Sequence, residues 1–280
     1  MSTQLNMFET KQPTPAKPKD EDAFFRTLKM LNMSRTQAGE YSRYSVNCYR
    51  GCGHLCDYCY VPATIKMARE EFNKEAIPHF TTTKVKRDVL EVLEQDLIKM
   101  KANGYGIETN ILMSFTTDPY HHGDVKHGIT RRAIKLIKQY GLSFTTLTKG
   151  GKRALRDIDL FRKNGVDMFA STLTTLDPTE SLKIEGGAAL PQDRIETLKQ
   201  FKEKGIYTWV SLEPVFNPAQ TIEIVKQTHE FVDLFKVGKI NYHRIANTID
   251  WQKFTDDIVK TLDSVGANRY IKNDLKPFLK

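Results

Sequence analysis

Residues 47–60 read NCYRGCGHLCDYCY and contain all four cysteines of the 280-residue chain, at Cys48, Cys52, Cys56 and Cys59. Thiolates this close together on one loop can bind a compact metal centre. A structural zinc site usually takes two ligand pairs a dozen or more residues apart, and this chain has no second pair. Crowding on one loop and an intracellular setting also disfavour disulfides. An iron–sulfur cluster fits the spacing best.

From Tyr41 onwards the chain alternates between strand and helix patterns. Short apolar runs predict six strands, at 43–47, 110–115, 142–147, 166–173, 206–212 and 232–237. Helical periodicity predicts helices at 85–100, 130–140, 153–164, 193–204, 219–228 and 250–265. Strands that alternate with helices favour a parallel sheet. The cysteine loop and the segments that follow the later strands should then share one rim.

Composition limits the class of protein. The hydrophobic content of 40% can bury a core. No apolar run approaches the ~18 residues that span a bilayer, and the first residues lack the layout of a signal peptide. We therefore expect a cytoplasmic protein without membrane contact. A polar, proline-containing extension at 1–40 is predicted to be mobile, with a short helix around 24–31.

Cys52, Cys56 and Cys59 form the pattern C-x3-C-x2-C, with the aromatic Tyr58 before the last cysteine. This pattern, placed after the first of six strands, resembles the signature of the radical S-adenosylmethionine (SAM) superfamily. The resemblance implies an α/β fold with a partial (β/α)6 TIM-type barrel over 41–245, followed by a C-terminal helix and basic tail at 246–280.

The same resemblance implies the cofactors. The three cysteines would hold a [4Fe–4S] cluster whose remaining iron binds the amino and carboxylate groups of SAM. An electron from a reductant such as flavodoxin or ferredoxin would cleave SAM to a 5′-deoxyadenosyl radical, which abstracts a hydrogen atom from a substrate.

Further segments resemble the spore photoproduct lyase-like branch of this superfamily. They are YRGCGHLCDYCY (49–60), SFTTDPYHH (114–122), TLTKG (146–150), STLTTLDP (171–178), IEGGAALPQDRIETL (184–198) and SLEPV (211–215). By this resemblance Lys149 and Thr172 would hold the SAM carboxylate and neighbouring polar atoms. Tyr58 would contact the adenine, and Glu185 with Arg194 would shape the SAM pocket.

The residue types agree with these roles but also allow plainer ones. A lysine at the end of a strand can neutralise a carboxylate, although Lys149 could be a solvated surface residue. Arg194 could equally lie on the exposed face of a helix, and Tyr58 could be a packing aromatic. Thr117 and Asp118 end the second strand, where hydrogen bonds to SAM or substrate are predicted.

Spore photoproduct lyase uses a cysteine near the end of the second strand to return a hydrogen atom. Here residues 113–118 read MSFTTD, and no cysteine follows Cys59, so the usual hydrogen donor of the lyase is absent. Tyr60 and Cys48 are the candidate catalytic residues, because a phenol or a thiol can donate a hydrogen atom. Cys48 could equally be an accessory cluster ligand or an ordinary buried cysteine.

Of the net charge of +8, residues 111–165 contribute +7, from eleven Lys and Arg against four Asp and Glu. Such a concentration favours a polyanionic partner, although a solvated helix face is the plainer alternative. Gly150 and Gly151 would let a ligand approach the backbone, and residues 120–122 could stack a base. We therefore predict a nucleic-acid base as substrate, in DNA repair or modification. A peptide or small-molecule substrate, and a zinc-binding adaptor without catalysis, remain alternatives.

Overall fold

The computed structural model describes residues 31–33, 39–63, 83–241 and 243–280. Most of the predicted N-terminal extension, with its short helix, lies outside the described residues. Leu31, the predicted end of that helix, instead begins strand β1 (Leu31–Met33).

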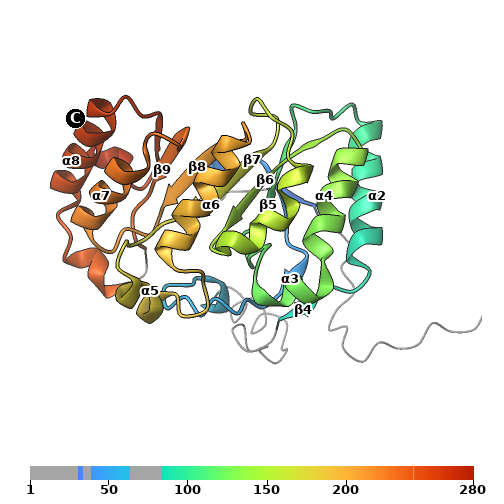
Figure 1. The fold of residues 1–280 in the computed structure, drawn as a ribbon, viewed down its shortest axis with the longest axis horizontal. Coiled ribbons are helices and arrows are strands. Elements are labelled where there is room, and N and C mark those ends of the chain that lie inside the picture. Colours follow the sequence, from blue (N-terminus) through green and yellow to red (C-terminus); the bar gives the residue numbers. More distant parts are fainter. Residues whose placement is uncertain (1–30, 34–38, 64–82, 242) are drawn as a thin grey trace, which may run out of the picture.

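An eight-stranded sheet forms the centre of the molecule (Figure 1), in the order β1-β2-β5-β6-β7-β8-β9-β10. The six predicted strands are confirmed as β2 (Tyr44–Val46), β5 (Asn110–Met113), β6 (Ser143–Thr148), β7 (Met168–Thr172), β8 (Tyr207–Leu212) and β9 (Leu234–Val237). Every neighbouring pair from β2 to β10 is parallel, whereas β1 is antiparallel to β2. The order ends at β1 and β10, so the barrel is partial.

The segment after the C-terminal helix is more than a basic tail. Arg269–Ile271 form β10, a seventh parallel strand that pairs with β9. The sequence pattern does not predict β10, because its two apolar residues, Tyr270 and Ile271, have polar neighbours on both sides. Lys272, which counts among the basic residues of the tail, is 2% exposed.

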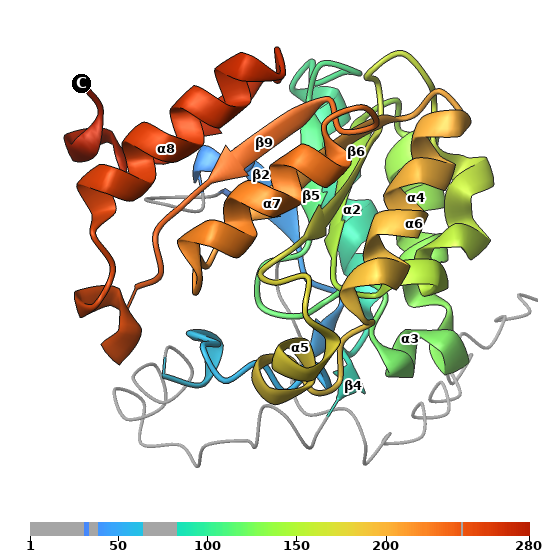
Figure 2. The same cartoon turned by 60° about the vertical axis from the view of Figure 1, so that its left-hand side comes forward.

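Long helices flank the sheet (Figures 1 and 2) and lie where they were predicted. They are α2 (Val89–Ala102), α4 (Ile129–Gln139), α6 (Pro191–Glu203), α7 (Pro218–Thr228) and α8 (Trp251–Ser264). Shorter elements are α3 (His122–His127), α5 (Pro178–Ile184), η3 (Arg244–Asn247), η4 (Lys276–Phe278) and the strand pair β3 (Tyr49–Arg50) and β4 (Lys84–Val85). None of the described helices has the length and apolar character of a membrane span.

The helix predicted at 153–164 is instead a 3-10 helix, η2 (Gly151–Leu160). Its buried residues are Gly151, Ala154, Asp157 and Leu160. They recur every third position, which matches the three residues per turn of a 3-10 helix and explains the tighter winding.

Side chains of the strands alternate between two faces of the sheet. Those facing the helices form the main apolar core, with Ile111, Phe144, Phe169, Val210 and Phe235 each fully buried. The opposite face, inside the partial barrel, has a smaller apolar cluster of Leu112, Ala170 and Trp209, against which Tyr41 and Phe115 pack. Polar side chains such as Thr145 and Lys236 share this inner face with the cluster.

Candidate functional site

The three predicted cluster ligands lie on the loop that follows β3, beyond the carboxyl end of β2. Cys56 is buried, and Cys52 and Cys59 are half-buried. Gly51 and Leu55 have positive φ angles of 75° and 54°, so the chain turns sharply on either side of Cys52. The three thiols therefore lie on one short loop between β3 and β4, and the backbone of this part of the chain lies at the rim of the sheet (Figure 2).

The donor set fits an iron–sulfur cluster. Burial raises the pKa of Cys52 to about 12 and that of Cys56 to about 11, so these thiols remain protonated until a metal binds. Within the described ranges, no three His, Cys, Asp or Glu side chains converge closely enough to hold a single metal ion. A [4Fe–4S] cluster does not require that convergence, because its thiolate ligands bind different iron atoms.

Residues 184–189, which follow α5, dock on the cysteine loop. The amide of Asp57 donates to the first carbonyl of this segment (3.0 Å), and the amide of Gly187 donates to the carbonyl of His54 (3.0 Å). A Cβ on Gly187 would lie 1.8 Å from the carbonyl oxygen of Gly53. Glycine is therefore required where the two segments meet.

Glu185 and Arg194 form a buried ion pair beneath the loop, with Nη2 and Oε2 2.6 Å apart and side chains 0% and 1% exposed. Tyr58 donates its hydroxyl to Oε1 of the same carboxylate, and Arg194 also donates to the carbonyl of Thr172 (3.0 Å). Burial raises the pKa of Glu185, but Arg194 and Lys149 hold it below its ordinary value. The alternative that Arg194 lies on an exposed helix face is therefore wrong.

Lys149 directly follows β6 and faces the cysteine loop, with Nζ 5.6 Å from the centre of the Tyr58 ring. Burial lowers its pKa, but the nearby Cys56 and Glu185 raise it more, so the pKa lies above its ordinary value. A charged ammonium thus points at the loop. Its contact with the SAM carboxylate stays a prediction, as do the SAM contacts of the residues around it.

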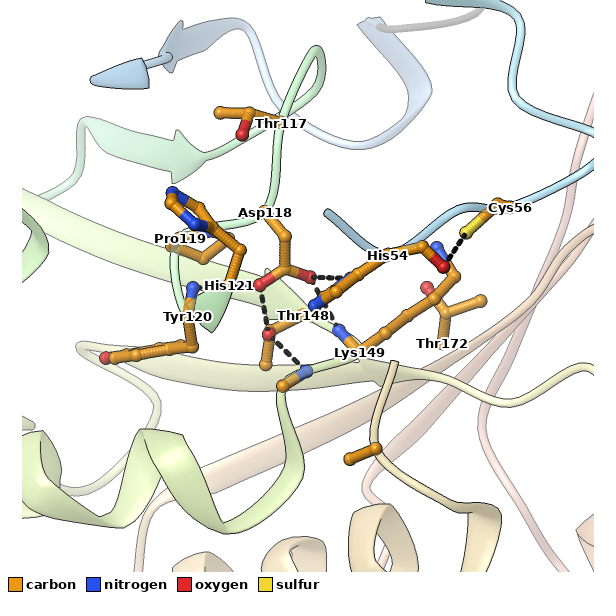
Figure 3. Close-up of polar contacts among 12 residues, drawn as sticks. His54, Cys56, Thr117, Asp118, Pro119, Tyr120, His121, Thr148, Lys149 and Thr172 are labelled. Atoms are coloured by element: carbon orange, nitrogen blue, oxygen red, sulfur yellow. Dashed lines mark hydrogen bonds and ion pairs between the residues drawn. The ribbon is translucent and has the colours of Figure 1, made fainter. Parts of the chain in front are cut away.

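Asp118 joins the ends of β5 and β6 behind the loop (Figure 3). Its Oδ1 accepts hydrogen bonds from Thr148 Oγ1 (2.6 Å) and the amide of Tyr120 (2.8 Å). Its Oδ2 accepts from the amide of Lys149 (2.7 Å) and lies 3.4 Å from Nδ1 of His54. Burial raises the pKa of Asp118, but these contacts, led by His54, hold it below the ordinary value. Both oxygens are therefore occupied by protein donors.

Thr117 supports the loop as well. Its side chain is 9% exposed and donates to the carbonyl of Gly51 (2.8 Å), directly before the first cluster ligand. Thr117 and Asp118 were predicted to contact SAM or substrate, and that contact stays a prediction. In the structure, both side chains bind backbone groups: Thr117 binds the carbonyl of Gly51, and Asp118 binds the amides of Tyr120 and Lys149.

His54 is a residue that the sequence reasoning missed, and it links the loop to Asp118 (Figure 3). It is 2% exposed, and its Nε2 lies 3.2 Å from Nη2 of Arg153. Burial lowers its pKa to about 4, so the ring is neutral. We assign Nδ1–H as donor to Asp118 and Nε2 as acceptor from Arg153. A lone histidine inside the motif carries no signal of these contacts, because both partners lie far along the chain.

The two candidate hydrogen donors have different surroundings. Tyr60 is 51% exposed and donates its hydroxyl to the carbonyl of Phe115 (3.3 Å). Cys48 is 3% exposed and packs in the core on the helix side of the sheet, where burial raises its pKa to about 12. This placement is typical of a structural cysteine and disfavours a catalytic role for Cys48. The roles of both residues stay predictions.

The residues expected to stack a base, 120–122, are mostly packed against other parts of the protein. Tyr120 and His121 are each 1% exposed, so their predicted stacking role is wrong. His122 is exposed, and its stacking role stays a prediction. A Cβ on Gly150 would lie 2.7 Å from Cβ of Tyr120, and one on Gly151 would lie 2.4 Å from Oδ1 of Asp193. These glycines allow close packing inside the protein, not the approach of a ligand.

Much of the positive charge of residues 111–165 is also used internally. Its ion pairs join Arg131 to Asp157 and Asp159, Arg156 to Asp124 and Asp157, and Arg162 to Asp167. Exposed cations of the segment include Lys126, Arg132, Lys135, Lys152 and Lys163. Among these five, only Lys152 lies within four residues of the carboxyl end of a strand, in the first turn of η2. Internal pairing and solvated helix faces thus account for most of this charge.

Residues 46–232 match the radical SAM superfamily. An uncharacterized protein of Methanocaldococcus jannaschii is 25% identical over 240 residues, which cover 79% of this chain and 86% of that protein. An uncharacterized protein of Mycobacterium tuberculosis is 28% identical over 176 residues, which cover 62% of this chain and 49% of that protein. The chain thus matches about half the length of its mycobacterial relatives.

Solved structures confirm the predicted fold. A spore photoproduct lyase mutant with bound AdoMet and dinucleoside spore photoproduct has a TM-score of 0.63 at 15% identity, covering 88% of this chain and 79% of that one. Streptococcus suis SuiB bound to S-adenosylmethionine has a TM-score of 0.58 at 17% identity, covering 84% of this chain and 52% of that one. At such identities the likeness shows the fold alone.

Proposed function

This chain belongs to the radical SAM superfamily, and from that membership we propose that it holds a [4Fe–4S] cluster on Cys52, Cys56 and Cys59 and binds SAM beside it. When bound and reduced, these cofactors supply a 5′-deoxyadenosyl radical that abstracts a hydrogen atom from a substrate. The observation that carries the proposal is the loop of three thiols, braced by buried groups at the carboxyl end of the sheet. A flavodoxin or ferredoxin is the proposed reductant.

The residues around the loop can hold SAM in the orientation that the reaction needs. Lys149 is proposed to neutralise the SAM carboxylate, since its ammonium is charged and faces the loop. Tyr58 is proposed to contact the adenine, and its hydroxyl is fixed by Glu185. Arg194 holds Glu185 and the carbonyl of Thr172 at once, so the pair would shape the pocket without binding the cofactor directly.

A nucleic-acid base is the proposed substrate. It is supported by the fold, which is shared with a spore photoproduct lyase mutant with bound dinucleoside spore photoproduct. The exposed Lys152, four residues after β6, would meet phosphates of such a substrate. The same fold occurs in SuiB bound to its precursor peptide, so a peptide is the rival substrate. Tyr60 is the proposed hydrogen donor, because its half-exposed phenol follows Cys59 directly.

The test is anaerobic. The protein is reconstituted with iron and sulfide, then supplied with SAM, dithionite and single-stranded or duplex DNA, and 5′-deoxyadenosine is quantified by chromatography. We expect a brown protein that releases 5′-deoxyadenosine, more of it with DNA, and no release by the Cys56→Ala variant. Tyr60→Phe should still cleave SAM but form no final product.

Each other outcome is decisive. Release that does not respond to DNA would leave the enzyme standing and remove the nucleic-acid substrate. A colourless preparation without release would overturn the radical reaction, and a zinc-bound adaptor would replace it.

A further inference from the structure

Glu213 lies at the carboxyl end of β8 and faces the inside of the partial barrel. Side chains alternate along a strand, so Glu213 shares its face with Ser211 and Trp209 of β8. Tyr41 reaches this face from the other end of the sheet, with its ring 5.8 Å from Trp209 and 6.0 Å from Phe115. The result is a carboxylate among aromatic rings.

One oxygen of this carboxylate is firmly held. Tyr41 donates its hydroxyl to Oε2 (2.5 Å), and Lys272 donates its ammonium to the same atom (2.5 Å). The side chain of Lys272 is 3% exposed and that of Glu213 is 18% exposed. A Cβ on Gly238 would lie 2.8 Å from Cδ of Glu213 and from Cδ of Lys272. A glycine at this position of the next strand leaves space for the pair.

The other oxygen of Glu213 is available. Among the described residues no donor bonds to Oε1, and this atom is not among the fully buried ones. A carboxylate oxygen can accept about two hydrogen bonds. Glu213 therefore presents a fixed acceptor, and it does so close to the cysteine loop. Tyr60, next to the last cluster ligand, bonds to Phe115, whose ring contacts Tyr41.

A second lysine, Lys236, lies on the same face of the sheet as Glu213. Lys236 on β9 is the register partner of Ser211, and its Nζ is 4.6 Å from the centre of the Trp209 ring. It donates to the carbonyls of Glu40 and Tyr41 (3.2 and 3.3 Å), so among the described residues one of the three donors of its ammonium has no hydrogen-bond acceptor. Glu213 and Lys236 thus follow or lie on neighbouring strands and face the same side of the sheet, where Tyr41 and the buried Trp209 pack.

Building on the proposed function, we propose that Oε1 of Glu213 binds an exocyclic amino group on the edge of the substrate base. Acidic side chains accept hydrogen bonds from such groups, as from N4 of cytosine. A ring nitrogen beside the amino group is an acceptor that suits Lys236. Thymine fits poorly, because its only N–H lies between two carbonyl oxygens, which repel a carboxylate. The site therefore selects adenine or cytosine over thymine.

Fluorescence anisotropy tests this selection with the reconstituted protein, SAM and labelled decamers of dA, dC and dT. Wild-type protein should bind the dA and dC decamers more tightly than the dT decamer. In Glu213→Gln, Tyr41 and Lys272 would donate to the amide oxygen, so the amide NH2 group would take the place of Oε1. This NH2 group is a hydrogen-bond donor and cannot accept a hydrogen bond from the amino group of the base. We expect about a tenfold loss of affinity for dA and dC, and no change for dT. Equal binding of the three decamers, or equal affinity of variant and wild type, overturns the proposal.

Two further variants keep the test decisive. Glu203→Gln makes the same chemical change at the exposed end of α6 and should behave as wild type. Tyr41→Phe removes one of the two donors to Oε2 and should lower the preference for dA and dC by about threefold. If Glu213→Gln does not fold, an unchanged preference in Tyr41→Phe overturns the proposal.

The wild-type preparation is also assayed for 5′-deoxyadenosine. If no 5′-deoxyadenosine is released, the proposed function is refuted. The preference for dA and dC over dT tests the role of Glu213 separately.

Discussion

Asp118 and Glu213 are acidic residues that follow parallel strands of one sheet, yet the two regions of the molecule use them differently. Beside the cysteine loop, both oxygens of Asp118 accept hydrogen bonds from the protein. Beside β9 and β10, the donors among the described residues reach only Oε2 of Glu213. A position at the end of a strand therefore does not define the role of a carboxylate. The number of protein donors around it does.

The two regions also differ in what holds them together. The cysteine loop rests on buried charges, chiefly the Glu185–Arg194 pair. The β9–β10 region has an ion pair between Lys272 and the partly exposed Glu213. It also rests on contacts between the two ends of the described chain, where Glu40 accepts hydrogen bonds from the amide of Asn273 (2.7 Å) and the hydroxyl of Tyr270 (3.3 Å). The cysteine region should thus respond most strongly to the loss of a charge.

The largest expected effect is that of Arg194→Met. It leaves Glu185 charged and buried without its partner, and breaking such a pair costs about 3–5 kcal/mol of folding stability. Urea denaturation of the metal-free protein measures the loss, and iron content after reconstitution should fall with it. The double variant Glu185→Gln/Arg194→Met should recover at least half of the stability, because no unpaired charge remains. A single variant as stable as wild type would show that this pair does not support the loop.

The next effect tests the contrast between the two carboxylates directly. Asp118→Asn must turn an NH2 group toward N–H or O–H donors whichever way its amide points, at a cost of about 3 kcal/mol. Glu213→Gln can point its NH2 group away from Tyr41 and Lys272, so we expect a cost of about 1–2 kcal/mol. Thermal or urea denaturation of both variants gives the comparison. Equal losses would mean that the free oxygen of Glu213 has a protein partner in solution.

The smallest effect concerns pH and again separates the two regions. His121 is the N-cap residue of α3, and its Nδ1 accepts a hydrogen bond from the amide of Gly123 (2.9 Å). Burial lowers the pKa of His121 to about 4. The unfolded histidine titrates at about 6.5. Between these values the unfolded chain binds a proton that the native chain does not, so stability falls as the pH falls from 6.5 toward 4. Burial also lowers the pKa of His54 to about 4, so this residue likewise reduces folding stability as the pH falls.

His121→Asn tests this pH dependence, because asparagine also begins helices well and does not titrate. Between neutral pH and about pH 4.5, we expect the free energy of unfolding to fall by about 1–3 kcal/mol less in the variant than in wild type. Urea denaturation at several pH values measures the difference. Hydrogen exchange should show acid-induced opening near α3 and the cysteine loop before it shows opening near β10. Identical pH profiles for variant and wild type would contradict the burial of His121.

A good part of the molecule could be predicted from the sequence. The six strands and most helices follow from apolar periodicity, which is local and therefore readable along the chain. The strand β10 and the 3-10 winding of η2 were missed, since one is three residues long and the other depends on which side chains pack inside. The SAM-contacting residues were placed by resemblance, and their contacts stay predictions.

The fold class and the cysteine motif can be recognised along the chain, because spacing and periodicity are properties of neighbouring residues. Only the tertiary structure decided which polar side chains are occupied. It placed His54 between Asp118 and Arg153, buried Tyr120 and His121, and left one oxygen of Glu213 without a donor from the part of the chain that the structure describes. The physical reason is that hydrogen bonds and burial depend on partners from distant strands, which come together only when the sheet forms.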